Sequence, residues 1–181
     1  MVTTLVWLTL VVVAAWAASR HWKLRDFAAE RMSRPSALLS AKLVYMEKVF
    51  RIERPFPLVA KVDRVYRRPN GHLVLVELKT RETDRVFLSD VIQLSAQRMA
   101  VRSQTGAAVD AHAFVSFQGH GGSGRLSSRR VQLLEEETLV EIYQRRRALL
   151  TTQTSPTYAH SDAVCQRCAQ RSNCDRFNQG N

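Results

Sequence analysis

The chain has 181 residues, a length that fits one folded domain with an appendage and excludes an array of several full domains. It carries 27 Lys and Arg against 16 Asp and Glu, so its formal net charge is +11. This excess favours a polyanionic partner, either nucleic acid or an anionic membrane surface. Charge alone neither decides between the two nor excludes a merely well-solvated basic surface.

Residues 2–19, VTTLVWLTLVVVAAWAAS, contain no charged side chain. A helix of that length rises about 27 Å, close to the hydrocarbon thickness of a bilayer. Trp16 and Trp22 suit a membrane interface. We therefore expect one N-terminal transmembrane helix. A cleavable signal peptide or a buried helix is the alternative. A signal peptide begins with a basic region, however, and no Lys or Arg precedes this segment.

Residues 20–34 are rich in Arg and Lys and are expected to form a basic juxtamembrane linker, whose charges can also bind lipid headgroups. Loops with such charges stay on the cytoplasmic side of a membrane. The pattern therefore predicts a single-pass protein of the inner (cytoplasmic) membrane. Its N-terminus lies outside, its main domain is cytoplasmic, and membrane lipid is its partner through residues 2–19.

A helix is expected over residues 35–51. Glu47 is the one acid in this stretch, and it is either a candidate metal ligand or a solvated or paired charge. The apolar residues at helical spacing are Leu39, Leu43, Met46 and Phe50, and they are expected to pack on a sheet.

The next segment, KVDRVYRRPNGHLVLVELKTR, reads as a β-hairpin with an acid on its first strand and an acid plus a lysine on its second. Residues i and i+2 of a strand share one face, so Glu77 and Lys79 point the same way out of a ribbon rich in Val and Leu. Charges in such a place are costly unless they are paired or bind a metal.

The turn of this hairpin decides whether Asp63 lies with them. A two-residue loop would set Asp63 opposite Leu78, on the wrong face. A three-residue loop over residues 69–71, with Gly71 left-handed, pairs residue 68 with residue 72 and sets Asp63 opposite Glu77. We favour this register because it gathers the carboxylates on one face, where their repulsion favours a hard divalent cation such as Mg²⁺.

Downstream, a helix is expected to begin at Ser89, as its cap, and to run to about Gln104. Asp90, Gln93 and Gln97 then lie along one stripe of it. For Asp90 the simpler explanation is a favourable charge on the first turn. Further along we expect strands over residues 111–117 and 129–134, a glycine-rich hairpin loop between them, a helix over residues 135–150 and a polar linker over residues 151–157.

Three cysteines, Cys165, Cys168 and Cys174, lie near the end of the chain. In a cytosolic chain such close spacing indicates metal ligands more often than disulfides. Three thiolates are one short of a tetrahedral site, and His160 is the nearest candidate for the fourth ligand. Zn²⁺ or an iron–sulfur cluster is the expected occupant. A degenerate remnant that binds no metal is the alternative.

Together these motifs resemble the PD-(D/E)XK nuclease superfamily. Asp63 matches the family aspartate, and Glu77-Leu78-Lys79 matches its ExK motif. Residues 90–94, DVIQL, resemble the DxxQL motif of RecB-type nucleases, although Gln97 stands where a tyrosine usually follows. The CQRCAQRSNC tail resembles that of the four-cysteine members, including the CRISPR-associated RecB-like exonucleases. These members have one earlier cysteine, which is absent here, and RecB-type members often have an upstream metal-binding histidine, which is absent too.

The resemblance implies an α/β fold with a restriction-endonuclease-like central mixed β-sheet flanked by helices. This nuclease-like core would span residues 35–150, after the anchor (1–19) and the linker (20–34) and before the tail (151–181). The resemblance implies Asp63, Glu77, Lys79 and Gln93 as catalytic residues. It implies Asp63, Glu77 and the backbone carbonyl of Leu78 as ligands of Mg²⁺ or Mn²⁺, with Glu47 a candidate for a further ligand.

The implied function is metal-dependent hydrolysis of phosphodiester bonds in DNA, for processing, repair or defence. A catalytically inactive, membrane-tethered nucleic-acid-binding module of the same fold is the alternative. A membrane scaffold that binds lipid through a basic face is a second alternative, but it leaves Asp63, Glu77 and Lys79 unexplained.

Overall fold

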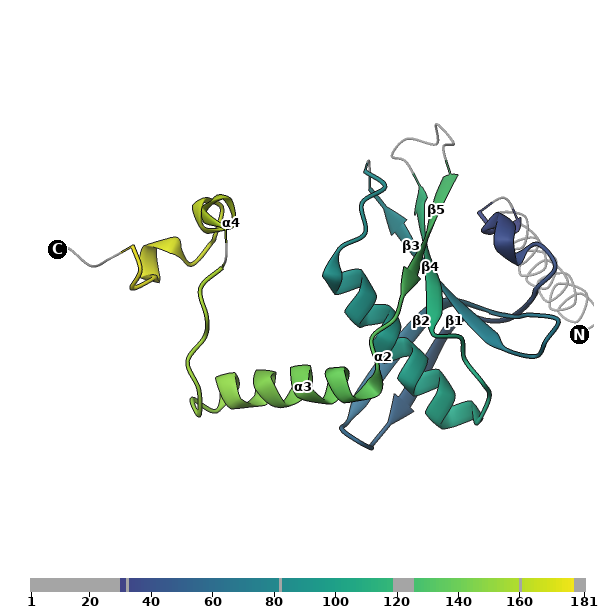
Figure 1. Ribbon diagram of the computed structural model, residues 1–181, viewed down its shortest axis with the longest axis horizontal. Helices are drawn as coiled ribbons and strands as arrows, with labels where there is room; N and C mark the ends of the chain where they lie inside the picture. The colour runs from purple at the N-terminus through teal and green to yellow at the C-terminus, as the bar shows by residue number, and fades with distance from the viewer. Residues whose placement is uncertain (1–29, 32, 82, 119–125, 160, 178–181) are drawn as a thin grey trace, which may run out of the picture. The chain divides into compact units, whose positions relative to one another are not determined.

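The computed structural model describes residues 30–31, 33–81, 83–118, 126–159 and 161–177 (Figure 1). The chain divides into two compact units, Met1–Val140 and Glu141–Asn181. Within the described residues, no helix is both long and apolar enough to cross a bilayer. The anchor expected over residues 2–19 lies outside the described residues.

A mixed sheet of five strands, in the order β1-β2-β3-β4-β5, forms the centre of the larger unit. β3 and β4 pair in parallel, and the other neighbours pair antiparallel. A parallel pair needs a crossover connection, and helix α2 (Leu88–Thr105) lies in the connection from β3 to β4 (Figure 1). The expected α/β fold with a mixed central sheet is thus confirmed. The strands are β1 (Lys42–Ile52), β2 (Leu58–Arg67), β3 (Leu73–Thr80), β4 (His112–Gln118) and β5 (Leu126–Gln132).

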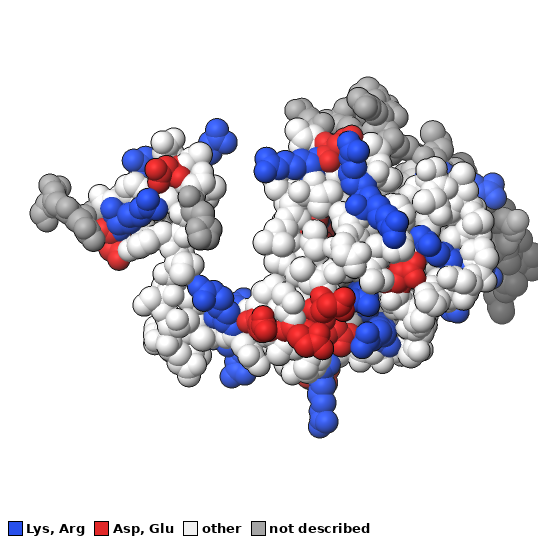
Figure 2. Space-filling model, viewed as in Figure 1, with Lys and Arg blue, Asp and Glu red and all other residues white. Residues whose placement is uncertain are grey.

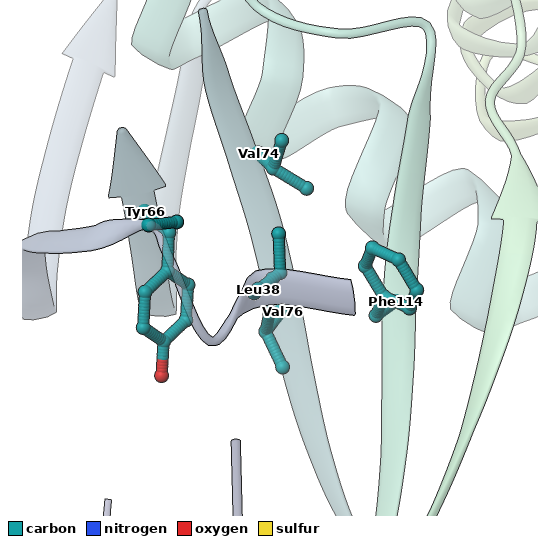
Figure 3. Packing of buried hydrophobic residues seen from close by; sticks show 6 residues of the cluster. Leu38, Tyr66, Val74, Val76 and Phe114 are labelled. Atoms are coloured by element: carbon teal, nitrogen blue, oxygen red, sulfur yellow. The ribbon is translucent and has the colours of Figure 1, made fainter. Parts of the chain in front are cut away.

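Both faces of β3 are buried, which explains its nearly continuous apolar sequence. Helix α2 covers one face and contributes the fully buried side chains of Leu94 and Val101. Leu38, from the short 3₁₀ helix η1 (Ser36–Leu38), lies over the opposite face (Figure 3). It packs there in a cluster with Ala41, Tyr66, Val74, Val76 and Phe114.

The helix expected over residues 35–51 is wrong, because this segment forms η1 and then the long strand β1. β1 pairs with β2 from Lys42 opposite Arg67 to Ile52 opposite Leu58. The segment is rich in β-branched and aromatic residues, which suit a pleated surface, and pairing with β2 overrides the helical spacing of its apolar residues. Glu47 therefore lies on a strand. Its backbone is left-handed, with φ 53°, which is uncommon for a residue other than glycine.

The helix expected from Ser89 is present, but its cap differs. α2 begins at Leu88, so Ser89 lies inside the helix, and the carboxylate of Asp90 accepts the backbone N–H of Phe87 at 2.9 Å. β4, β5 and α3 (Glu136–Leu150) lie within a few residues of their expected positions. The hairpin loop expected at residues 119–125 lies outside the described residues, and the antiparallel pairing of β4 with β5 agrees with it.

A buried ionic network joins Glu30 and Arg34 to the sheet. Glu30, only 1% exposed, accepts hydrogen bonds from Arg34 Nε at 2.7 Å, Arg34 Nη2 at 2.8 Å and the Tyr66 hydroxyl at 2.6 Å. Burial by itself raises the pKa of Glu30, but the bonds from Arg34 and Tyr66 bring that pKa below its usual value. Burial and the bond to Glu30 raise the pKa of Tyr66 to about 12.

The smaller unit contains most of α3, the short helix α4 (Asp162–Gln166) and the 3₁₀ helix η3 (Arg171–Asn173). Its three cysteines are free thiols, with Cys165 buried and Cys168 exposed. His160, the candidate fourth ligand, lies outside the described residues. Across the described part of the chain, no three His, Cys, Asp or Glu side chains are placed to hold a metal ion.

Candidate active site

The β2–β3 hairpin has the expected three-residue loop. The N–H of Arg68 donates to the carbonyl of His72 at 2.9 Å, and Gly71 is left-handed with φ 88°. The strands pair from Arg67 opposite Leu73 to Arg64 opposite Val76. One step further in this register, Asp63 lies opposite Glu77, so the predicted register is confirmed.

Backbone pairing between β2 and β3 ends at this point, and side chains continue it. The carboxylate of Asp63 accepts the backbone N–H of Leu78 through Oδ2 at 2.8 Å. The first candidate acid is thereby attached to the strand that carries the second. The charged residues of the hairpin thus lie at its open end, which is the end away from the turn.

Glu77 is 3% exposed and accepts hydrogen bonds on both carboxylate oxygens. Its Oε1 accepts from Lys79 Nζ at 2.8 Å and from Gln93 Nε2 at 2.7 Å, and its Oε2 accepts from Gln97 Nε2 at 3.0 Å. Lys79 Nζ also donates to Gln93 Oε1 at 3.0 Å. A buried carboxylate needs such partners, and here Lys79 of β3 and two residues of helix α2 supply them together.

Asp90, the first residue of the DxxQL-like motif, extends the same network. It is 4% exposed and pairs with Arg81, and its Oδ1 lies 3.8 Å from Lys79 Nζ. Burial raises the pKa of Asp90, but the Phe87 N–H and the Arg81 guanidinium outweigh that effect and lower the pKa below its usual value. Lys79 therefore lies between two carboxylates, those of Asp90 and Glu77.

The third acid, Glu47, lies on β1 next to this site. Met46 pairs with Arg64 and Lys48 with Val62, so Glu47 lies opposite Asp63 in the register. Glu47 lies on a strand and not on the predicted helix, and the pairing of β1 with β2 sets Glu47 beside Asp63. There it forms an ion pair with Lys61. Three acids, Glu47, Asp63 and Glu77, thus occupy one row across three adjacent strands.

The pKa of Asp63 is raised above its usual value. Burial is the largest cause, and the negative charges of Glu77 and Glu47 add to it, against the lowering effect of the Leu78 N–H. A divalent cation beside Asp63 and Glu77 would offset that repulsion. Mg²⁺ is commonly held by one or two carboxylates and keeps several waters, so this oxygen donor set suits it without a preformed cage of three acids.

This pKa predicts how stability depends on pH. The folded state binds the Asp63 proton more tightly than the unfolded state, so ionised Asp63 opposes folding. We expect Asp63→Asn to stabilise the metal-free protein at neutral pH. The wild type should gain stability relative to this variant as the pH falls through the folded pKa towards the unfolded value. Urea denaturation in EDTA at several pH values measures the free energy of unfolding of both proteins. Parallel pH profiles of that free energy would contradict the prediction.

Comparison with known proteins places these residues in a family. A family model described as the PD-(D/E)XK nuclease superfamily matches residues 4–175. The chain belongs to this superfamily. The match includes the Asp63, Glu77 and Lys79 positions and extends into the cysteine tail of this PD-(D/E)XK protein.

Two solved structures are similar to this PD-(D/E)XK protein at low identity. One is described as SSO0001, with 15% identity and a TM-score of 0.46. That match covers 91% of this chain and 71% of the SSO0001 chain. The other, a candidate exonuclease from Eubacterium rectale, has 12% identity and a TM-score of 0.43. That match covers 88% of this chain and 60% of the Eubacterium rectale chain. No curated protein matches the sequence significantly.

Proposed function

We propose that the protein is a membrane-anchored, metal-dependent nuclease that hydrolyses phosphodiester bonds in DNA. The observation that carries the proposal is the contact of Lys79 with Glu77 and Gln93 beside Asp63, in a chain that belongs to a nuclease superfamily. Packing alone gives no reason to bury a carboxylate and place a lysine ammonium against it, because both lose their hydration.

The residues divide into two roles. Asp63, Glu77 and the backbone carbonyl of Leu78 would hold Mg²⁺ or Mn²⁺, with Glu47 as a candidate further ligand. Such an ion, when bound, polarises the phosphate and lowers the pKa of a water molecule. Lys79 would orient the attacking water and stabilise the charge that develops on the phosphate. An ammonium group donates hydrogen bonds and is not a base. Gln93 holds Lys79 in place through its amide oxygen.

DNA is the proposed substrate because the chain belongs to a nuclease superfamily and carries a net charge of +11, which favours a polyanion. Figure 2 shows Lys and Arg side chains spread over the displayed face of the larger unit, with uncharged surface and some Asp and Glu side chains among them. Contacts between such side chains and phosphates release counterions, so the affinity for DNA should fall steeply with salt.

A cleavage assay on the full-length chain in detergent tests the proposal. End-labelled single- and double-stranded DNA is incubated with Mg²⁺ or Mn²⁺, and parallel samples contain EDTA. Cleavage that needs the metal supports a nuclease. Salt-sensitive DNA binding with no cleavage under any metal would instead favour the inactive nucleic-acid-binding module.

The membrane anchor is a separate part of the proposal. The uncharged residues 2–19 and the basic residues 20–34 that follow support insertion with the N-terminus outside and the nuclease domain in the cytoplasm. We expect the chain to fractionate with inner membranes. Protease added from the outer side should leave the C-terminal domain intact, and its digestion from that side alone would overturn the orientation.

Cys165, Cys168 and Cys174, with His160, are proposed to hold Zn²⁺ or an iron–sulfur cluster. The backbone N–H of Cys168 donates to the carbonyl of Cys165 at 3.1 Å, which keeps these two cysteines in one turn. Metal content and visible absorption are measured on anaerobically purified wild type and Cys168→Ser. We expect stoichiometric metal in the wild type and its loss in the variant. Metal-free wild type would mean that the cysteines are a remnant.

A further inference from the structure

Gln97 joins the two strands of the candidate site where their backbone pairing ends. The last backbone pair is Arg64 opposite Val76, so no ladder bond holds Asp63 to Glu77. From helix α2, Gln97 Nε2 donates to the carbonyl of Lys61 on β2 at 2.9 Å and to Glu77 Oε2 on β3 at 3.0 Å. A primary amide has two N–H groups, and this one uses both as a bridge between the strands.

The bridge is buried and differs from the other contacts of Glu77. Gln97 is 2% exposed, and it alone among the described residues donates to Oε2. Lys79 and Gln93 share Oε1 and also bond to each other, so they retain a partner when Oε1 binds something else. Gln97 has no such alternative, because its second N–H already donates to the carbonyl of Lys61 on β2.

We propose that Gln97 is a positioning residue that sets the metal affinity of the site. It fixes the orientation of the Glu77 carboxylate and its distance from the strand that carries Asp63, two residues after Lys61. This inference rests on the proposed function, because it assumes that Asp63 and Glu77 hold a divalent cation. Partners of this kind, which touch a ligand and not the metal, typically change metal affinity about 10–100-fold.

The chemistry of the bridge explains why a glutamine is needed there. Both partners of Gln97, a carbonyl and a carboxylate oxygen, are acceptors, so the bridging group must supply two donors. A hydroxyl supplies one donor, and an ionised carboxylate supplies none. Methionine has nearly the length and volume of glutamine but no donor, so Gln97→Met removes the bridge and keeps most of the packing.

Ser95 provides the matched control. It is 1% exposed and lies on the same helix, where its Oγ donates to the carbonyl of Val91 at 2.6 Å and accepts the N–H of Leu134 at 2.9 Å. Ser95→Ala therefore also removes buried hydrogen bonds from α2, but it touches neither candidate acid. Both variants should lose stability, since each leaves buried polar groups without a partner.

The experiment measures the Mn²⁺ dissociation constant by electron paramagnetic resonance, on full-length protein in detergent, together with the urea midpoint. We expect Gln97→Met to bind Mn²⁺ about 10–100-fold more weakly and Ser95→Ala to bind it as the wild type does. In cleavage, Gln97→Met should shift the Mn²⁺ midpoint and regain most of its rate at saturating metal. Gln97→Asn keeps the amide but is too short for both partners, so it should weaken binding too and serves if Gln97→Met does not fold.

Two results would overturn the inference alone. One is Mn²⁺ affinity in Gln97→Met equal to that of the wild type, and the other is an equal loss in Ser95→Ala. Either would leave the nuclease proposal intact, provided that the wild type binds Mn²⁺ and cleaves DNA. A wild-type protein that binds no Mn²⁺ would refute the metal site itself and this inference with it.

Discussion

Glu77→Gln and Lys79→Ala should each slow DNA cleavage by about 10³-fold or more, which corresponds to about 4 kcal/mol of lost transition-state stabilisation. Glu77→Gln removes a charge that is proposed to bind the metal, and it gives Lys79, Gln93 and Gln97 an amide in place of a carboxylate with acceptors only. Lys79→Ala removes the cation that is proposed to stabilise the reacting phosphate. Single-turnover cleavage of labelled DNA measures both effects.

DNA affinity should change little in these two variants, because most of it comes from phosphate contacts elsewhere on the protein. Glu135→Gln is the matched control: it makes the same chemical change at a largely exposed side chain that pairs with Arg98 at 3.6 Å. We expect that control to cleave at the wild-type rate. Wild-type activity in Glu77→Gln or Lys79→Ala would place the chemistry elsewhere or reveal a contaminating enzyme.

Glu30→Ala should destabilise the protein by about 3–5 kcal/mol, because removing one partner of a buried ion pair leaves the other charge buried without a partner. The stranded groups are the Arg34 guanidinium, whose side chain is 15% exposed, and the fully buried Tyr66 hydroxyl. The lowered pKa of Glu30 also sets a pH dependence. The stabilisation is present above the unfolded pKa and is lost as the pH falls through the folded pKa.

Urea denaturation of Glu30→Ala and Glu136→Ala separates a buried pair from an exposed one. Glu136 pairs with Arg102 at 3.2 Å, and the Arg102 side chain is 51% exposed. Loss of this ion pair in Glu136→Ala should therefore cost less than about 1 kcal/mol. Tyr66→Phe keeps the Glu30–Arg34 pair and should cost about 1–3 kcal/mol. Equal effects of Glu30→Ala and Glu136→Ala would mean that the network contributes nothing beyond a surface pair.

The open end of the β2–β3 hairpin could be predicted from the sequence, because its cause is local. A Pro-Asn-Gly turn with a left-handed glycine fixes the register, and a period of two then places Asp63, Glu77 and Lys79. The stripe of Asp90, Gln93 and Gln97 was predictable for the same reason, since helical spacing alone puts them on one side of α2.

β1 could not be predicted in this way, because the spacing of its apolar residues fits a helix as well as a strand. Its partner β2 decides between the two, and that pairing is not local. The role of Gln97 was hidden for a related reason. Its partners lie on two different strands, and one of them is the carbonyl of Lys61, a backbone group that leaves no mark on the sequence.

The β2–β3–α2 order of the chain has a consequence for how the site assembles during folding. The bonds that build it join residues 15, 16, 20 and 36 positions apart, from Asp63–Leu78 to Lys61–Gln97. Closing loops of these lengths costs little chain entropy, and each doubling adds only about 0.6 kcal/mol. One continuous stretch, residues 61–97, therefore holds every group of the network around Glu77, and that network can form before β4 and β5 join the sheet.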